Sequence, residues 1–477
     1  MAGHALSRPD APAFLCEDGV TTWSGYDRNG RERAEVLLAA GVRPRQRVAV
    51  MLPDGPEVHE WFLGIERAAA VIVGIGPRAG AAEVRHLLER SRAAYLVDAG
   101  GLHPVEGASA DDSIDIPPEL WLLNSTSGTT GLPKCVMHTQ SRWFFFHRLA
   151  VEAGALGEQD VFMSVLPAPF GFGIWTAHFT PALLGVPVVV MPRFSAAGAL
   201  DLIARHRVSV LACVSTQFVM MLNAAESDGR DLSSLRVMFT GGEAVPNERA
   251  SEFEERTGAR VLQFYGSNET GALSRTSLTD SRDRRLRTAG RTIDEMKVRL
   301  LDGDDDVTAS GGPGEPVCRG PALSMGYWDD DDANRRLYTP DGWMRTGDLA
   351  TIDPDGYLSV VGRLSDIIIR GGKNISAPQV ESEVATHPRV AMAAAVAMPD
   401  PVFGERVCVY VTLRDPVPLS LAELTEHLLS RGCGKELLPE RVVVLDELPT
   451  ASGGKVAKAE LREDIRRRLV EESPAGA

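Results

Sequence analysis

The sequence predicts an α/β protein with a large N-terminal domain of layered parallel sheets and helices, which also holds a β-rich subdomain, and a small C-terminal α+β domain. Helical and strand patterns alternate over residues 20–100 and 182–240, as in sheets with crossover helices. Strand-like pieces between Asp/Gly turns fill residues 296–363, and a separate set of helices and strands occupies residues 378–461. A chain of 477 residues is too long for one core of ordinary size, so two or more domains are expected.

Composition narrows the class of protein. The chain is 44% hydrophobic and 24% charged, as in soluble globular proteins, and its net charge of −15 argues against binding to nucleic acid or anionic membranes. The six cysteines are scattered without a Cys-x-x-Cys pair, so neither a disulfide framework nor a zinc cage is expected. The first 13 residues lack an apolar secretory core, and the longest apolar runs have strand length. We therefore expect a cytoplasmic enzyme with reduced thiols.

The elements of the first 121 residues alternate in type. Residues 23–40 and 58–70 have apolar positions at helical spacing, and residues 47–52 and 71–75 are short apolar strands. Residues 97–121 form a Gly-, Ala- and Asp-rich connection without periodicity. This region predicts an α/β scaffold rather than a site.

The next segment, residues 125–134, reads Ser-Thr-Ser-Gly-Thr-Thr-Gly-Leu-Pro-Lys directly after an apolar strand. Glycines let the backbone bend around an anion, hydroxyls and backbone N–H groups donate to phosphate oxygens, and Lys134 adds a positive charge. A Walker loop would end in Gly-Lys-Ser/Thr, but Leu132 and Pro133 separate the last glycine from the lysine. The segment predicts a polyphosphate loop of another kind, with a flexible surface loop as the alternative.

Further strands each end in glycine or polar residues. A helix at 143–155 precedes a strand at 161–166, which runs into Pro-Ala-Pro-Phe-Gly-Phe-Gly. A strand at 237–240 leads to a glycine pair, where backbone can approach a planar ligand. The strand from residue 261 ends in Tyr-Gly-Ser-Asn-Glu, which combines an aromatic ring for stacking with a carboxylate for magnesium. The acidic run 302–306 lacks EF-hand spacing and predicts a solvated turn.

Taken in order, these motifs resemble the adenylate-forming superfamily of acyl-CoA synthetases, adenylation domains and luciferases, and most of all a small aryl- or alkyl-acid CoA ligase. The resemblance runs from about residue 10 to residue 465. It implies an ATP- and substrate-binding domain at 1–363 and a mobile domain at 364–477 that carries the catalytic lysine and a thiol-facing loop. The connection at 97–121 is shorter than in most relatives.

The resemblance assigns roles to residues of this chain. Lys455, Lys134 and Glu269 are the expected catalytic residues, with Glu269 also the Mg²⁺ ligand. The expected ATP/AMP-binding residues are Thr126, Ser127, Gly128, Thr129, Thr130, Gly131, Gly242, Glu243, Ala244, Tyr265, Gly266, Asn268, Asp348, Val360 and Arg363. Asp348 is the expected ribose clamp, since a carboxylate accepts both hydroxyls. Asn268 stands where relatives have threonine.

The expected acyl pocket is aromatic. Its predicted residues are Phe170, Phe172, Gly173, Trp175, Gly241 and Ser267. Adenylation domains for α-amino acids place an aspartate here to hold the ammonium group, and no acidic residue lies between Pro167 and Arg193. The expected substrate is therefore an apolar or aryl acid other than an α-amino acid. Simple core packing of Phe170 and Phe172 is the alternative.

The last motifs concern the second domain. Ser365 is the expected hinge, where relatives carry aspartate or lysine. Gly371, Gly372 and Lys373 belong to the expected thiol-facing loop, and Arg370 beside them is a candidate for CoA phosphates. Lys455, on the Gly-rich loop that follows Pro449, is the expected adenylation lysine.

The predicted function is ATP-dependent activation of a carboxylic acid through an acyl adenylate, with release of pyrophosphate, followed by transfer to CoA. The implied cofactors are ATP, Mg²⁺ and CoA, or the phosphopantetheine of an acyl carrier protein. Three alternatives stay open: a stand-alone enzyme that loads a carrier protein, activation of another oxyacid such as nitrite for diazo formation, and an AMP-binding protein without catalysis. The acid and the oligomeric state, with a homodimer among the options, are not fixed by the sequence.

Overall fold

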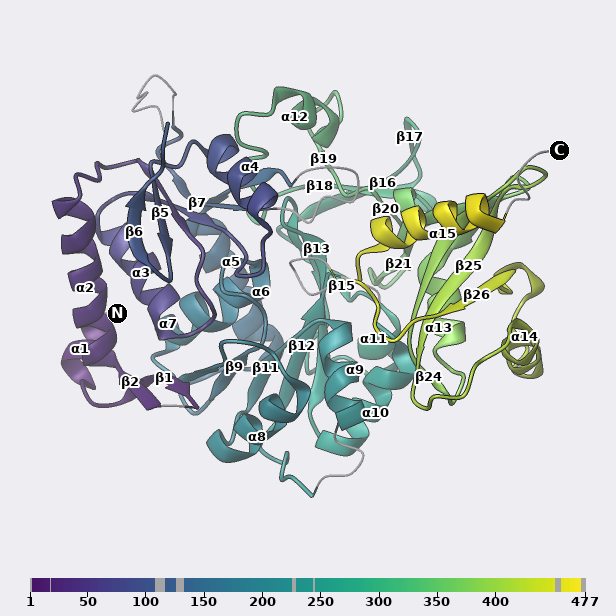
Figure 1. Ribbon diagram of the computed structural model, residues 1–477, viewed down its shortest axis with the longest axis horizontal. Helices are drawn as coiled ribbons and strands as arrows, with labels where there is room; N and C mark the ends of the chain where they lie inside the picture. The colour runs from purple at the N-terminus through teal and green to yellow at the C-terminus, as the bar shows by residue number, and fades with distance from the viewer. Residues whose placement is uncertain are drawn as a thin grey trace.

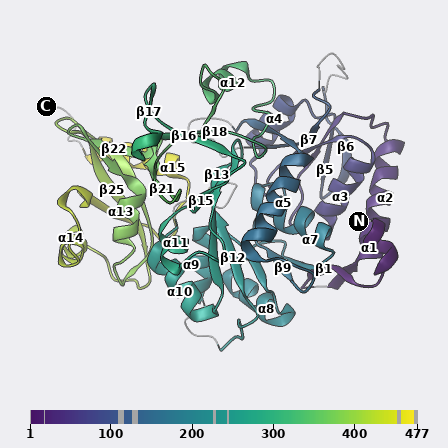
Figure 2. The same ribbon diagram turned by 180° about the vertical axis from the view of Figure 1, so that it is seen from behind.

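We describe a computed structural model of the chain, with the N- and C-terminal parts at opposite ends of the molecule (Figure 1) and the same arrangement seen from behind (Figure 2). It describes residues 2–17, 19–107, 116–125, 133–224, 229–242, 245–450 and 456–472; for Ser365 and Asn374 it describes the backbone alone. Every helix in these ranges is too short or too polar to cross a bilayer.

The first sheet confirms the α/β pattern predicted for the N-terminal region. Its strands lie in the order β6 (Gly101–Pro104), β5 (Tyr95–Asp98), β3 (Arg47–Val50), β4 (Val71–Gly74), β7 (Leu120–Ser125) and β8 (Cys135–Thr139). The inner strands are parallel, whereas β6 and β8 pair antiparallel at the edges. The accompanying helices are α2 (Trp23–Ala39), α3 (Pro56–Arg67) and α4 (Ala81–Ser91).

The second sheet occupies the centre of the molecule (Figure 1). Its order is β15 (Arg291–Thr292), β14 (Gly271–Arg275), β13 (Arg260–Ser267), β12 (Val237–Gly241), β11 (Val210–Ala212), β9 (Phe162–Ser164), β10 (Val188–Val190), β1 (Pro12–Cys16) and β2 (Gly19–Thr22). From β1 to β13 the pairings are parallel, as predicted for residues 182–240. The helices are α1 (Ala2–Ser7), α5 (Gln140–Gly154), α8 (Ala196–His206), α9 (Ser215–Ala224), α10 (Asn247–Thr257) and α11 (Arg282–Arg287).

Both sheets are buried on two faces, which follows from the period-2 alternation of side chains along a strand. In β3, Val48 and Val50 join one apolar cluster while Ala49 joins another on the opposite face. In β9, Phe162 belongs to the first of these clusters and Met163 to a third. The cluster that contains Val48 and Phe162 therefore lies between the two sheets.

A helical segment after β9 changes type along its length. It comprises α6 (Gly171–Gly173), a π-helical stretch η1 (Ile174–Phe179) and α7 (Thr180–Leu184). The π-helical stretch interrupts the α-helical geometry on either side of it. Pro181 has no N–H to continue the usual i→i−4 pattern. Such π stretches occur often beside functional sites.

The β-rich subdomain lies where the sequence predicted it. One sheet has the order β17 (Asp305–Asp306), β16 (Lys297–Asp302), β18 (Glu315–Arg319) and β19 (Met344–Arg345), and β20 (Asp348–Ile352) pairs with β21 (Leu358–Arg363). This part also holds η3 (Thr308–Ser310) and α12 (Asp331–Leu337). The acidic run forms the exposed β16–β17 hairpin, and no cluster of metal-ligating residues occurs there or elsewhere in the described ranges.

The C-terminal part follows the predicted succession of helices and strands. Its sheet has the order β23 (Lys373–Ser376), β22 (Ile367–Arg370), β25 (Gly404–Leu413) and β24 (Val390–Asp400), and β26 (Arg441–Val444) pairs with β25. Its helices are η4 (Leu364–Asp366), α13 (Ala377–Val384), α14 (Leu421–Ser430), η5 (Lys435–Leu437) and α15 (Lys458–Glu472). Among the described residues, the buried members of each apolar cluster lie either at or before residue 344 or at or after residue 368.

Candidate active site

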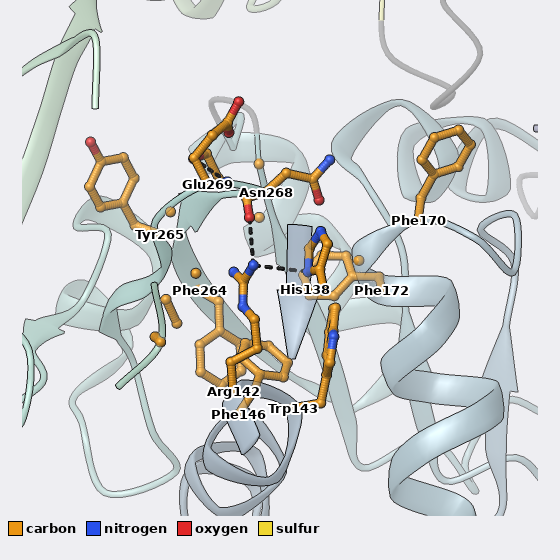
Figure 3. A pocket seen from close by; sticks show the side chains of 18 of the residues that line it. His138, Arg142, Trp143, Phe146, Phe170, Phe172, Phe264, Tyr265, Asn268 and Glu269 are labelled. Carbon is orange, nitrogen blue, oxygen red and sulfur yellow. Dashed lines mark hydrogen bonds between the residues drawn. The ribbon is translucent and has the colours of Figure 1, made fainter. Parts of the chain in front are cut away.

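A cavity of about 270 Å³ lies where the ends of several strands meet the starts of α5 and α6 (Figure 3). Its walls come from segments far apart in the sequence. The lining residues are Ser125, His138, Arg142, Trp143, Phe146, Leu166, Phe170, Gly171, Phe172, Val214, Gly241, Gly242, Phe264, Tyr265, Gly266, Ser267, Asn268, Glu269, Gly271, Ala272, Ala322 and Arg363. The cavity thus gathers predicted nucleotide-binding and predicted substrate-binding residues.

The residues predicted to bind the nucleotide's sugar form one group. The Tyr265 hydroxyl donates to Asp348 Oδ2 at 2.7 Å, and Arg363 Nε lies 3.3 Å from Asp348 Oδ1. Asp348 begins β20 directly opposite Arg363 on β21, so strand register brings the pair together. Burial and the neighbouring Asp348 carboxylate raise the pKa of Tyr265, which keeps its hydroxyl a donor. Val360, predicted to join them, is exposed on β21 and outside the cavity lining.

The predicted phosphate and magnesium residues meet at one tyrosine. The Tyr327 hydroxyl donates to Glu269 Oε1 at 2.7 Å, and Lys134 Nζ lies 4.7 Å from the centroid of the Tyr327 ring. Tyr327 stands in no motif that would have selected it from the sequence. Mg²⁺ is usually held by one or two carboxylates together with substrate phosphates, so the single carboxylate of Glu269 fits this ion when phosphates supply further ligands.

Glycines let backbone segments approach one another at the cavity. A Cβ at Gly241 would lie 2.1 Å from the Phe264 carbonyl oxygen, and one at Gly266 would lie 1.7 Å from the Gly271 carbonyl oxygen. Gly242 adopts a φ of +78°, which a side chain would disfavour. Any larger residue at Gly241 or Gly266 would push these strands apart.

The predicted acyl-pocket residues divide into two groups. Phe170, Phe172, Gly241 and Ser267 line the cavity. Trp175 lies behind the wall, fully buried, with edge contacts to Phe146 and Phe239. Gly173 is also outside the lining, and a Cβ there would lie 2.1 Å from the Pro167 carbonyl oxygen. Both residues support the wall rather than form its surface.

A buried polar network that the sequence analysis missed crosses the cavity (Figure 3). Arg142 Nη1 donates to His138 Nδ1 at 2.9 Å and to the Asn268 carbonyl oxygen at 2.8 Å. His138 Nε2 then donates to Asn124 Oδ1 at 2.7 Å, and Asn124 Nδ2 lies 3.4 Å from Asn268 Oδ1. Asn268 Nδ2 donates to the Ser125 carbonyl oxygen at 3.3 Å. The side chain of Asn268 is therefore oriented by two neighbours.

Burial fixes the charges in this network. It holds the pKa of His138 well below the ordinary value, and the nearby Arg142 cation lowers it further. His138 is therefore neutral, with its proton on Nε2, because Nδ1 accepts from Arg142. Burial lowers the pKa of Arg142 to about 10, while Glu269 acts to raise it. Arg142 stays a cation at neutral pH.

The residues predicted to face the thiol lie on the β22–β23 hairpin of the C-terminal part. Arg370 and Lys373 are paired across it, and Gly371 and Gly372 form its turn with φ of +58° and +81°. Arg370 donates to Glu440 and to the Glu436 carbonyl oxygen, so it supports the local structure.

Several predicted residues lie outside the described part of the chain. These are Thr126, Ser127, Gly128, Thr129, Thr130, Gly131, Glu243, Ala244 and Lys455, together with the side chain of Ser365.

Comparison with known proteins identifies the family of this chain. The model of the AMP-binding enzyme family matches residues 2–119 and 106–328, and the model of the AMP-binding enzyme C-terminal domain matches residues 379–455. The chain is 31% identical to the medium-chain fatty-acid–CoA ligase of Escherichia coli (strain K12), over 98% of this chain and 90% of that protein.

Solved structures with the same architecture carry nucleotide or adenylate ligands. The anthranilate CoA ligase AuaEII in complex with anthranoyl-AMP has a TM-score of 0.88 over 98% of this chain and 96% of that one; at 23% identity it shows the fold alone. The o-succinylbenzoate coenzyme A synthetase of Bacillus subtilis, in complex with ATP and magnesium ion, is 27% identical, with a TM-score of 0.82 over 98% of each chain.

Proposed function

Because the chain belongs to the AMP-binding enzyme family, we propose that it is an AMP-forming ligase that activates a small aryl or alkyl carboxylic acid with ATP and transfers the acyl group to CoA. One observation supports this most directly. Tyr265 and Arg363, which hold Asp348, line the same cavity as Glu269 and the aromatic side chains of Phe146, Phe172 and Phe264. A nucleotide and an apolar acid can therefore meet in one cavity.

In the first step, a carboxylate oxygen of the acid forms a bond to the α-phosphorus of ATP, and the bond to pyrophosphate breaks. Positioning and charge neutralisation supply most of the rate in such transfers. Asp348 accepts the ribose hydroxyls, with Tyr265 and Arg363 fixing its orientation. Lys134 and Glu269 lie at the phosphate end, and Mg²⁺ held by Glu269 would neutralise phosphate charge. Lys455 bridges the carboxylate and the α-phosphate.

In the second step, a thiolate attacks the acyl carbonyl, and the bond from this carbon to the AMP oxygen breaks. We propose that residues 364–477 turn about Ser365 as a mobile domain relative to residues 1–363, so that Lys455 leaves and Gly371, Gly372 and Lys373 face the thiol. The division of the buried clusters between residues 344 and 368 supports this boundary. A cytoplasmic location and a homodimer remain predictions. The six cysteines are free thiols, which is compatible with a reducing compartment.

The experiment that tests this function measures pyrophosphate release with ATP and a panel of aryl, alicyclic and fatty acids plus nitrite, with and without CoA, and identifies products by mass spectrometry. We expect an acyl-CoA product that is lost in Lys455→Ala and retained in Lys435→Ala, a variant of an exposed lysine of the same part of the chain. AMP formation without a thioester would mean that the acyl group is transferred to a carrier protein or another acceptor instead of CoA. Activity with nitrite alone would overturn the carboxylic-acid assignment.

A further inference from the structure

One cation in the cavity, Arg142, has no anionic hydrogen-bond partner among the described residues, and Glu269 is the acidic group whose charge acts on it. Arg142 is only 5% exposed, and among the described residues it forms no ion pair. The Arg142 side chain donates two hydrogen bonds to the described residues, both from Nη1. The acceptors, His138 Nδ1 and the Asn268 carbonyl oxygen, are uncharged. The Arg142 Nη2 and Nε groups make no hydrogen bond to this part of the chain. A buried charge in such a setting is costly unless a partner arrives.

Other buried arginines of this protein bond to carboxylates or to backbone carbonyl oxygens. Arg249 pairs with Glu252, and Arg285 pairs with Glu254. Arg47 uses Nε and Nη2 to donate to two backbone carbonyl oxygens. Arg142 differs from them because its remaining donors belong to a residue that lines the cavity. An incoming ligand is the partner that this cavity can admit.

A second donor lies beside it. Trp143 is 6% exposed and lines the same cavity, and its indole Nε1 is buried with no acceptor among the described residues. The helix that carries both residues begins at Gln140, with Thr139 accepting from the Arg142 N–H as its N-cap. This N-cap fixes the backbone of the first turn of α5, which carries Arg142 and Trp143.

The position of Arg142 favours the acid rather than ATP as that ligand. Lys134 and Tyr327 mark the phosphate end, whereas Arg142 rises from α5 beside Trp143 and Phe146, whose apolar rings favour an organic acid, and points its guanidinium toward the Asn268–Glu269 turn (Figure 3). The space is small: about 270 Å³ lies below the usual range of about 300 to 1,000 Å³ for ligand pockets. It is also shared with Tyr265 and Arg363, which favours an acid with a single ring or a short chain.

We propose that Arg142 is a specificity-determining residue, which selects a small carboxylic acid that carries a second oxyanion group on the part that enters the cavity. The planar guanidinium suits a carboxylate or sulfonate, and the Trp143 ring, whose centroid lies 5.8 Å from the guanidinium carbon, packs beside it. The aromatic side chains around it contact the hydrocarbon body of the acid. This inference rests on the proposed function, since it names the substrate class of that reaction.

The test compares each diacid with its own monoamide, which has nearly the same size and lacks the second charge. The acids are the three benzenedicarboxylates, malonate, succinate and glutarate, each with its monoamide, and the readout is kcat/KM for pyrophosphate release. We expect at least one diacid to exceed its monoamide by about 10- to 100-fold, the range for a hydrogen bond to a charged group. In Arg142→Gln that ratio should fall to near 1, whereas Arg142→Lys should keep part of it.

Controls separate recognition from structure. Arg148→Gln changes an exposed arginine of the same helix and should leave the ratio unchanged. Trp143→Phe keeps an aromatic ring beside Arg142, removes a buried N–H and should leave the ratio near the wild-type value, whereas Arg142→Lys preserves the test if Arg142→Gln fails to fold. An equal loss for diacid and monoamide, or a raised KM for ATP alone, would overturn the inference. So would a wild-type preference for monoamides or simple monoacids, although the proposed function would then stand. If no acid releases pyrophosphate, the proposed function itself fails.

Discussion

The Tyr265 hydroxyl donates a 2.7 Å hydrogen bond to Asp348 Oδ2 across 83 residues of sequence, while Arg363 Nε lies 3.3 Å from the other carboxylate oxygen. Two groups from different strands thus fix one carboxylate before any nucleotide arrives. Preorganisation of this kind lowers the ordering cost of binding. It predicts that Tyr265 acts on nucleotide affinity through Asp348 as well as by contact.

Tyr265→Phe tests this relationship. The variant keeps the ring and removes the hydrogen bond, so we expect KM for ATP to rise about 3- to 10-fold, in line with one lost hydrogen bond, with little change in kcat. Steady-state kinetics at saturating acid measure both constants. The matched control is Tyr357→Phe, which removes a tyrosine–aspartate bond to Asp280 away from the cavity. Equal effects in the two variants would contradict the prediction.

Glu269→Gln tests the magnesium end of the cavity. The amide keeps an acceptor for the Tyr327 hydroxyl but loses the charge, so we expect pyrophosphate release to fall about 10²- to 10³-fold and the half-saturating Mg²⁺ concentration to rise. A Mg²⁺ titration with each variant measures this. Tyr327→Phe removes only the group that orients Glu269, and its loss should be much smaller. Unchanged Mg²⁺ dependence in Glu269→Gln would rule out the assignment of Glu269 as ligand.

The sequence predicted most elements of the fold because the signals were local. Apolar periodicity located α2 and α8, and the Asp/Gly turns separated β16 from β18. It did not predict the π-helical stretch at Ile174–Phe179, where the backbone adapts to the packing of Trp175 against Phe146 and Phe239. Contacts between distant segments decide that conformation, and no local pattern encodes them.

Some residues of the candidate site could be predicted from the sequence, and others could not. Tyr265, Glu269 and Asp348 stand in short motifs and were found from the sequence. His138, Arg142 and Tyr327 were not, because they stand in no such motif: His138 lies on β8 and Arg142 on α5, so their spacing of four residues places them on no common helix face. Their function follows only from burial, which depends on how β8 and α5 pack against the Asn268 turn. The spacing of His138 and Arg142 was the available signal, and it is weak.

Asn124→Ala tests the polar network that orients Asn268. Asn124 is 1% exposed, and its loss leaves the His138 Nε2–H and Asn268 Oδ1 without this partner. We expect the free energy of unfolding to fall by about 1 to 3 kcal/mol, the cost of a buried unsatisfied group, together with a lower kcat. Denaturant unfolding and steady-state kinetics measure the two effects. Asn29→Ala, which removes a bond to Glu60 remote from the cavity, should leave kcat unchanged.

Asp54 gives the protein a distinctive dependence on pH. Burial raises the pKa of its carboxyl to about 7, although the Ala168 N–H and Arg78 act to lower it. Between pH 4 and 7 the folded protein therefore keeps a proton that the unfolded chain has released. The contribution of Asp54 to the free energy of unfolding therefore falls as pH rises through that window and is constant above it.

Asp54→Asn removes this titration, so the Tm of the variant should exceed that of the wild type by an amount that grows from pH 5 to pH 8. Asp160→Asn is the control of opposite sign. Burial alone would raise the Asp160 pKa, but hydrogen bonds from Arg236, Gly157 and Ser209 hold it below its ordinary value. The Tm of Asp160→Asn should lie below that of the wild type, and the difference should be largest at neutral pH. Parallel Tm profiles for Asp54→Asn and wild type would contradict the prediction.

The two glycines of the β22–β23 turn have two possible explanations: the turn geometry requires them, or they leave room for the thiol to pass. Variants at Gly372 separate the two. Gly371 and Gly372 both have positive φ, as a two-residue hairpin turn of the primed type requires, and a Cβ at Gly372 would meet nothing within 4 Å. Gly372→Ala should lower the free energy of unfolding by about 1 to 2 kcal/mol through backbone strain alone. Gly372→Asn should cost less, because asparagine tolerates this conformation. Both variants should release pyrophosphate at the wild-type rate.

Thioester formation then decides the role of the turn. If this loop faces the pantetheine arm, alanine and asparagine at position 372 both place atoms where the thiol must pass, and both should slow transfer to CoA about 10-fold or more. Single-turnover transfer from preformed acyl adenylate measures that step apart from the first. If transfer slows only in Gly372→Ala, in proportion to its lost stability, the glycine serves the turn and the thiol passes elsewhere. Lys373→Gln in the same assay reports whether the adjacent charge attracts the phosphates of CoA.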